Sequence, residues 1–248
     1  AETTTSVGKL LEIEAYIAHN MVHTRFDYST GDAAGQNMTG KATFVACEWI
    51  REQVPYMRHY MLSGAFDTEK RTSFVNSLKG RGRRVTAELT IPREVLANVL
   101  RITPEQMHYG YTVTTLSSFL TGSSNNAAHP ANGLAALYMA TGQDMANIGE
   151  ANQCSVYNYV TRDGDLHFSI TLPALIMATY GGGTSLATQR ECLEIMDCYG
   201  AGKAYKLLEI AAAMTVAGEL SLGAATRVDK ETRTHERVDA TVQPGRNP

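Results

Sequence analysis

Two ionisable residues in contrasting surroundings have the types needed for chemistry on a carbonyl group. The first is Lys70, which lies in the charge-dense segment Asp67-Thr-Glu-Lys-Arg71, shortly before Lys79-Gly-Arg-Gly-Arg-Arg84. A lysine whose positive charge is stabilised can polarise a carbonyl oxygen and stabilise an oxyanion. The alternative is that these charges form only a solvated surface, which is the usual role of such a segment.

The second residue is Asp144, which directly follows a stretch, residues 106–143, without any Asp, Glu, Lys or Arg. An acid in such surroundings requires a cation or hydrogen bonds. We expect Lys70 to be its partner, and a purely structural ion pair is the competing explanation. Polar residues, glycines and a proline interrupt the stretch too often for a membrane span. It is expected in the interior or at a subunit interface.

Two segments have little side-chain bulk at the point where a helix is expected to begin. They are Gly31-Asp-Ala-Ala-Gly-Gln-Asn-Met-Thr-Gly40 and Tyr180-Gly-Gly-Gly-Thr184. Small residues allow a phosphate group to approach the backbone amides of a helix N-terminus. For the first segment, a tight turn capped by Asp32 is an equally good explanation. For the second, the alternative is a flexible connection.

Hydrophobic alternation and turn residues predict an α+β protein. Two strands are expected within residues 8–28, followed by a helix from an Asp32 cap to about residue 52 and a returning strand at 56–62. A domain boundary is expected near residue 62. The later part is predicted to contain strands at 84–91, 155–160 and 166–173 and helices at 134–147, 186–199 and 204–225. Residues 230–239 include six charged residues, and this end is expected to be solvated.

Composition excludes some partners and favours one compartment. The chain has 248 residues and 44% hydrophobic content, and its net charge of -3 offers no broad basic surface for nucleic acid. Its four cysteines and seven histidines lack zinc-ligand spacing, so we expect no metal and free thiols in a reducing cytosol. A cytoplasmic protein without a membrane segment is the expectation.

Four motifs in the same order resemble those of one enzyme family. They are Gly31-Asp-Ala-Ala-Gly-Gln-Asn-Met38, Gly142-Gln-Asp-Met-Ala-Asn147, Gly181-Gly-Gly-Thr184 and Ala217-Gly-Glu-Leu-Ser-Leu222. Together they resemble the catalytic portion of the 3-hydroxy-3-methylglutaryl-CoA (HMG-CoA) reductases, from about residue 4 to residue 235. The resemblance implies a small ferredoxin-like cofactor domain at 1–62, incomplete at its start. It also implies a larger mixed α/β domain with a long central helix at 63–235, and a flexible tail at 236–248.

The resemblance also implies a cofactor, a substrate and a set of site residues. NADP(H) would be bound by Asp32, Gly35, Asn37, Gly181, Gly182 and Gly183. The catalytic residues would be Lys70, Asp144 and His235, the last protonating the departing CoA thiolate. An acyl-CoA substrate would be contacted by Ser63, Glu69, Arg71 and Asn132. The implied reaction is reduction of a thioester to an alcohol in two hydride steps.

The chain departs from the family pattern at several positions. Ala34 and Gln36 stand where methionines are usual, Glu69 where an aspartate is usual, and Arg71 where a lysine is usual. The family's catalytic glutamate and its main CoA-binding segment lie upstream of residue 1. We therefore expect an upstream segment or a second chain to complete the site, within a homo-oligomer that shares active sites. Two alternatives stay open: other acyl-thioester or carbonyl chemistry, and a non-catalytic binding paralogue.

Overall fold

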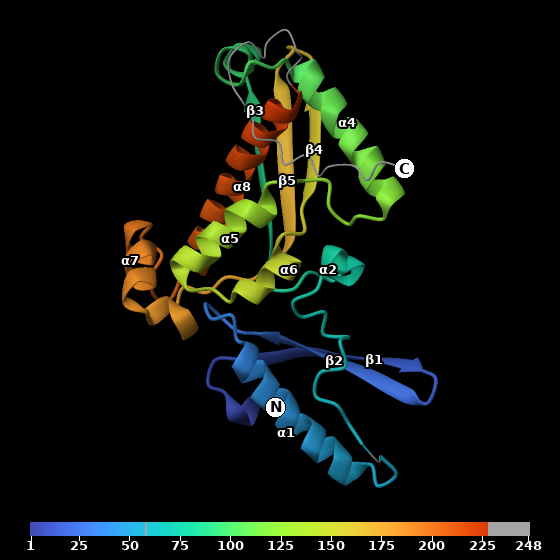
Figure 1. Cartoon of the computed structure of the whole chain (residues 1–248). Coiled ribbons are helices and arrows are strands. Elements are labelled where there is room, and N and C mark those ends of the chain that lie inside the picture. The colour runs from blue at the N-terminus through green and yellow to red at the C-terminus, as the bar shows by residue number, and fades with distance from the viewer. Residues whose placement is uncertain (58, 228–248) are drawn as a thin grey trace, which may run out of the picture.

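The computed structural model describes residues 1–57 and 59–227, which form two parts joined by a loop (Figure 1). The smaller part, called the small subdomain below, contains a short helix η1 (Glu2–Thr4), strands β1 (Lys9–Ala18) and β2 (Met21–Ser29) and helix α1 (Gln36–Gln53). The two strands form an antiparallel hairpin with Ala18 opposite Met21. His19, in the two-residue turn, has a φ of 56°.

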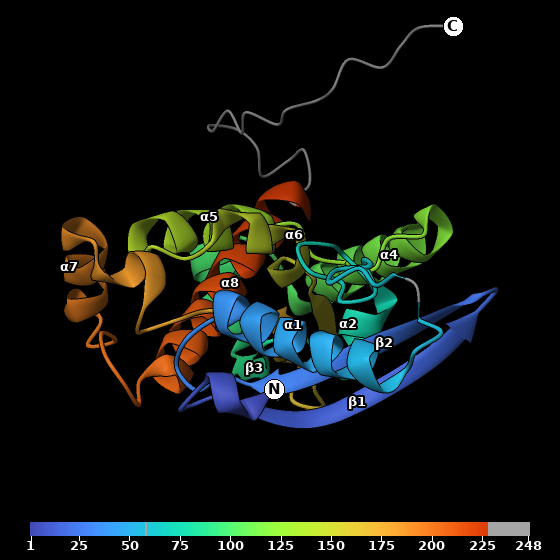
Figure 2. The same ribbon diagram turned by 90° about the horizontal axis from the view of Figure 1, so that it is seen from below.

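Helix α1 lies along the hairpin, as two perpendicular views show (Figures 1 and 2). The hydroxyl groups of Tyr28 on β2 and Thr43 on α1 are hydrogen-bonded at 3.1 Å. Gly35 precedes the helix with a left-handed φ of 78°. A Cβ atom at this position would lie 2.3 Å from Cγ2 of Thr30, so only glycine fits at the start of α1.

The larger part is built on a three-stranded antiparallel sheet in the order β3-β5-β4. These strands are β3 (Arg83–Ile91), β4 (Ser155–Val160) and β5 (Leu166–Leu175). Leu166, Phe168, Ile170 and Leu172 alternate along the central strand and are all completely buried. Side chains two apart in a strand point to the same face, so this face of β5 forms the centre of the core.

Helices cover that face of the sheet. Helix α8 (Ala204–Arg227) packs on β3 and β5, and α4 (Pro104–Thr121) packs on β4. The ring of Tyr111 on α4 meets Phe168 edge-on, with 5.4 Å between ring centroids. By length and composition α8 could span a membrane, but 56% of its most apolar window is buried within the protein. It is therefore the central core helix of this part.

Shorter helices complete the larger part, and α2 and α6 among them lie next to the small subdomain (Figure 1). They are α2 (Phe74–Lys79), α3 (Arg93–Val95), η2 (Leu96–Leu100), α5 (Pro130–Thr141), η3 (Met145–Asn147), α6 (Ile148–Ala151), η4 (Gly182–Ser185) and α7 (Ala187–Ile195). All four cysteines are free thiols, and Cys154 and Cys198 are buried.

The α+β class is confirmed, as are the hairpin, the strands of the larger sheet and the helices near residues 187 and 204. The strand predicted at 56–62 is wrong: the described residues of this stretch pair with no strand, and Tyr56 and Met61 are more than 80% exposed. The helix predicted at 134–147 ends at Thr141, because Gly142 turns the chain into a left-handed conformation with a φ of 69°.

The predicted helix cap at Asp32 is also wrong. Asp32 does not cap α1. Its carboxylate instead accepts hydrogen bonds from the backbone N–H groups of Gly202, at 2.8 Å, and Ala204, at 3.2 Å. The aspartate thus satisfies free donors at the start of α8, which is distant in sequence, and joins the small subdomain to the core helix.

Candidate active site

The loop that carries Lys70 connects the two parts and has a strained backbone. Ala65, Thr68 and Lys70 have φ values of 67°, 57° and 60°, in the left-handed region that non-glycine residues rarely occupy. Such backbone persists only where the surroundings hold it in place. The Thr68 hydroxyl donates to Oδ1 of Asn76 at 2.6 Å, and the Lys70 backbone N–H donates to Oε1 of Glu150 at 3.3 Å. The position of Lys70 is therefore fixed by residues of the larger part.

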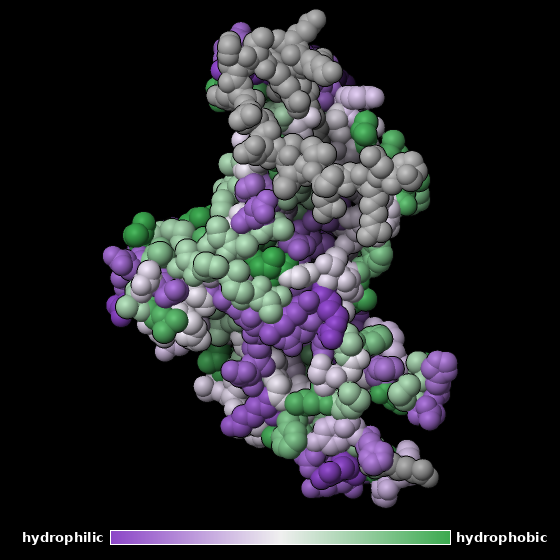
Figure 3. Space-filling view, viewed as in Figure 1, coloured by the Kyte–Doolittle hydropathy of each residue, from purple (hydrophilic) through white to green (hydrophobic). Residues whose placement is uncertain are grey.

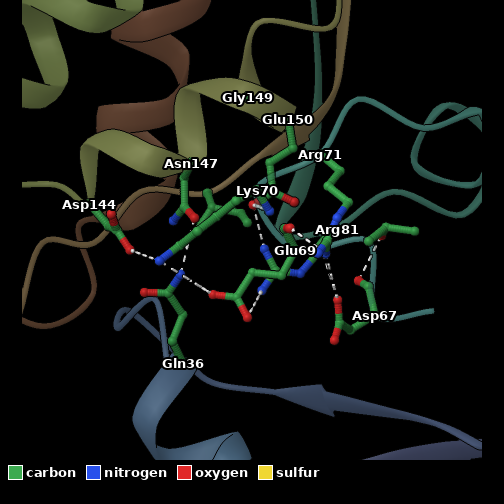
Figure 4. Close-up of polar contacts among 12 residues, drawn as sticks. Gln36, Asp67, Glu69, Lys70, Arg71, Arg81, Asp144, Asn147, Gly149 and Glu150 are labelled. Atoms are coloured by element: carbon green, nitrogen blue, oxygen red, sulfur yellow. Dashed lines mark hydrogen bonds and ion pairs between the residues drawn. The ribbon is translucent and has the colours of Figure 1, made fainter. Parts of the chain in front are cut away.

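The predicted pairing of Lys70 with Asp144 is confirmed (Figure 4). Lys70 Nζ lies 3.0 Å from Asp144 Oδ2, while Asp144 Oδ1 caps η3 by accepting the backbone N–H of Ala146 at 3.0 Å. The hydrogen bond to Asp144 raises the pKa of Lys70. Burial acts to raise the pKa of Asp144, but the bonds from Lys70 and Ala146 outweigh it and the pKa is lowered. Both groups are therefore charged at neutral pH.

A second layer of polar side chains surrounds this pair (Figure 4). Glu69 Oε1 lies 3.8 Å from Lys70 Nζ and accepts a hydrogen bond of 2.9 Å from Nε2 of Gln36. The carboxylate of Glu150, which is completely buried, binds Nη1 of Arg81 at 2.5 Å. Burial raises the pKa of Glu150, although the arginine opposes this change. Glu69, Arg81 and Glu150 thus place charges of both signs around the loop that carries Lys70.

An open pocket of about 330 Å³ lies beside the pair and is lined by Ser63, Glu69, Lys70 and Arg71. All four residues were predicted as catalytic or substrate-contacting residues, and the structure brings them together. Ser63 Oγ donates to Asp67 Oδ2 at 2.5 Å. Hydrophilic side chains gather on this side of the molecule between α6 and α1 (Figure 3). The pocket can therefore hold a polar or anionic group next to the lysine ammonium.

The two glycine-rich segments, residues 31–40 and 180–184, lie close to the loop before Asp144. A Cβ atom on Gly142 would lie 2.3 Å from the carbonyl oxygen of Gly183, so the loop before Asp144 packs directly on the triple-glycine loop. Gly181 and Gly182 have φ values of 81° and 57°, and a Cβ atom on either would meet open space. The Thr179 backbone N–H donates to the Asp32 carbonyl at 3.1 Å, which brings the first glycine segment to the residues between β5 and the triple-glycine loop.

Two further predicted residues, Asn37 and Asn132, lie outside this cluster of contacts. Asn37 is exposed in the first turn of α1, and Asn132 is exposed in the first turn of α5. His235 and the tail at 236–248 lie outside the described residues.

Comparison with known proteins identifies the family. A family model described as hydroxymethylglutaryl-coenzyme A reductase matches residues 1–240. The chain belongs to the HMG-CoA reductase family. It is 40% identical over 240 residues to the 3-hydroxy-3-methylglutaryl-coenzyme A reductase of Pyrococcus abyssi, covering 94% of this chain and 59% of that protein.

Other members of the family show the same partial coverage. The enzyme of Methanothermobacter thermautotrophicus is 41% identical, with 96% of this chain and 60% of that protein covered. Reductase 2 of Dictyostelium discoideum is 36% identical, with 94% and 46% covered. The chain thus spans about three fifths of the length of the archaeal HMG-CoA reductases it matches.

Sequence reasoning did not assign roles to Gln36, Asn147 and Glu150, which the structure places around the Lys70 loop. Glu150 carried a usable signal, because like Asp144 it is an acid in a stretch, residues 102–161, without Lys or Arg, and so required a partner from elsewhere. At position 36 the sequence shows only a departure from the HMG-CoA reductase pattern. Its partners come from segments distant in sequence, which no local pattern reveals.

Proposed function

We propose that this chain is the C-terminal part of the catalytic region of an NADPH-dependent HMG-CoA reductase. The reaction converts HMG-CoA to mevalonate and free CoA, and it consumes two NADPH and two protons. The observation that carries the proposal is the Lys70–Asp144 ion pair of 3.0 Å beside a polar pocket. Membership of the family supports this chemistry, and the rest of the enzyme is expected from sequence outside this chain.

Lys70 supplies electrostatic stabilisation at the reacting carbon. Its ammonium group would donate to the carbonyl oxygen of the thioester, and later of the aldehyde, as negative charge develops there. Asp144 orients the ammonium group and keeps it protonated, which agrees with the raised pKa of Lys70. The side chain of Lys70 is 42% exposed, so a substrate can reach it.

The residues proposed for NADP(H) are Asp32, Gly35, Asn37, Gly181, Gly182 and Gly183. When bound, NADPH supplies the hydride. Gly181 and Gly182 have no Cβ atom and face open space, so a large anionic cofactor could approach their backbone closely. Asp32 would act by holding the first segment in place, since its carboxylate is bonded to the start of α8. We further propose that β1, β2 and α1 are part of a ferredoxin-like unit.

The remaining parts of the proposal concern the complete enzyme. His235 would protonate the sulfur of the departing CoA thiolate, since an imidazole titrates close to neutral pH. A catalytic glutamate and a CoA-binding segment would come from an upstream segment or a second chain. The enzyme would be a cytoplasmic homo-oligomer with active sites shared between subunits.

The test is an NADPH-oxidation assay with HMG-CoA, run on this chain and on the longer protein that includes the missing segment. Lys70→Ala should lower kcat of the active protein by on the order of a thousandfold, the effect of removing one oxyanion donor, with NADPH affinity changed less than threefold. Lys41→Ala, at an exposed lysine of α1, is the control and should leave kcat unchanged. His235→Ala should spare the reduction of a free aldehyde. An unimpaired Lys70→Ala variant would refute the assignment.

A further inference from the structure

Gln36 connects the small subdomain to both segments that supply the ion pair. Its Nε2 atom donates to Oε1 of Glu69, beside Lys70, at 2.9 Å and to Oδ1 of Asn147, close to Asp144, at 3.0 Å (Figure 4). An amide nitrogen carries two protons, so both donors are used. We propose that Gln36 is a positioning residue that couples the placement of the small subdomain to the orientation of the Lys70 ammonium. Its catalytic consequence rests on the function proposed above.

The coupling arises from competition between two carboxylates for one ammonium group. Lys70 Nζ lies 3.0 Å from Asp144 Oδ2 but 3.8 Å from Glu69 Oε1. The oxygen of Glu69 that is nearer to the lysine is the same oxygen that Gln36 binds. Gln36 therefore keeps Glu69 from bonding directly to Lys70, and the ammonium stays directed at Asp144.

The second bond of Gln36 fixes the opposite side of the pair. Asn147 is buried, and its backbone N–H donates to the Asp144 carbonyl at 3.0 Å, closing the turn that Asp144 caps. The Lys70 loop, whose left-handed backbone must be held by its surroundings, gains in Gln36 a contact from the small subdomain. One amide group thus spans the lysine side and the aspartate side of the site.

The direction of the Gln36 side chain is set by the glycine segment before it. Gly35 starts α1 in a left-handed conformation, and its carbonyl accepts the Thr39 N–H at 2.9 Å. Asp32 anchors the same segment to α8. A displacement of this segment, such as cofactor binding would produce, therefore moves Gln36 and alters the competition for Lys70.

The first experiment measures backbone hydrogen exchange at pH 7 in peptides covering residues 66–72 and 144–150 of this chain. Gln36→Met should accelerate exchange in both peptides by roughly three- to tenfold, the factor that corresponds to losing one or two hydrogen bonds. Gln53→Met, the same change at the exposed end of α1, is the matched control and should have no effect. Unchanged exchange in Gln36→Met would overturn the proposal.

A charge swap separates this specific contact from a general packing role. Gln36→Glu places a carboxylate against Glu69, and the repulsion should accelerate exchange more than Gln36→Met does. The double variant Gln36→Glu/Glu69→Gln restores one donor and one acceptor between positions 36 and 69, and exchange in the 66–72 peptide should return to within about twofold of the original. A double variant whose 66–72 peptide exchanges as fast as in Gln36→Glu would refute the contact.

The catalytic consequence is measured separately on the longer, active protein. Gln36→Met should lower kcat on the order of tenfold, since the lysine is misdirected, while KM for NADPH changes less than threefold. A raised KM with an unchanged kcat would instead make Gln36 a cofactor ligand and overturn the positioning role. If the unmodified protein shows no turnover, the proposed function fails, and the exchange experiments still decide whether Gln36 couples the two parts.

Discussion

At the scale of single residues, the lysine loop depends on a glycine that lies against its backbone. A Cβ atom on Gly149 would be 2.6 Å from the Lys70 carbonyl oxygen and 3.1 Å from its carbonyl carbon. Both atoms belong to backbone that cannot rotate away. Glycine at 149 therefore permits the close approach of α6 to the loop, and through it the approach of Lys70 to Asp144.

Gly149→Ala should consequently destabilise the protein by about 1–3 kcal/mol, the usual cost of inserting a methyl group where there is no space.

Gly40→Ala on α1 is the matched control, because a Cβ atom there meets nothing within 4 Å. It should stabilise the protein by about 0.5–1 kcal/mol, the difference in helix propensity. Urea unfolding measures both changes. A neutral Gly149→Ala variant would contradict the contact.

At the scale of elements, α8 owes the start of its helix to a residue 172 positions away, counted from Asp32 to Ala204. Asp32→Ala removes the acceptor for two backbone N–H groups and a negative charge at the positive end of the helix. The expected loss of unfolding free energy is about 0.5–2 kcal/mol. Urea unfolding gives the value, and hydrogen exchange at residues 202–206 should accelerate with it.

Asp163→Ala, at an exposed position of the turn between β4 and β5, is the control for that substitution and should change stability little. Equal losses in the two variants would contradict a capping role for Asp32.

The connection between α7 and α8 makes stability depend on pH in the acid range. Hydrogen bonds from Lys203 and Lys206 lower the pKa of Asp197 from 3.8 to about 2. Because the folded-state pKa is depressed, the stabilisation is complete well above pH 4 and is lost as the pH falls towards 2. Asp197→Asn should therefore lower Tm at pH 6 and have a much smaller effect near pH 2. Asp163→Asn is the control, and a Tm difference that is as large at pH 2 as at pH 6 would refute this explanation.

At the scale of the whole molecule, the feature that bears on self-association is an exposed apolar face of α4. Tyr109, Val113, Leu116 and Leu120 are spaced along one side of α4, and all are exposed, Leu120 to 82%. The run 106–143 was predicted to be an interior or interface segment. Its inner side, at Met107 and Tyr111, lies in the core, and the outer side is proposed to contact another subunit.

Leu120→Lys should therefore weaken self-association, measured as a shift towards the monomer in sedimentation at a fixed protein concentration. Ile195→Lys on α7 is the matched control, since Ile195 is 80% exposed and lies on a different helix. The same shift in both variants, or in the control alone, would argue against α4 as the interface.

The sequence was most informative where the signal was local. The strands predicted at 155–160 and 166–173 and the helix predicted from 204 follow from alternation, a polar turn and a continuous apolar face, and all three are observed. The Lys70–Asp144 pair could also be predicted, because an isolated acid next to a charge-free run requires a cation. Predictions failed where structure depended on partners: residues 56–62 have strand-like composition, but those of them that the structure describes pair with no strand.

The sequence by itself determined the α+β class, the three strands and three of the helices of the larger part, the family and the pairing of one lysine with one aspartate. The tertiary structure alone decided that Asp32 caps α8, that Gly149 makes room for the Lys70 loop, and that Gln36 bridges both sides of the ion pair. The physical reason is the separation along the chain between the residues that each interaction joins. Hydrophobic periodicity acts between neighbours along the chain, whereas a hydrogen bond or a steric contact depends on which distant segments folding brings within a few ångströms.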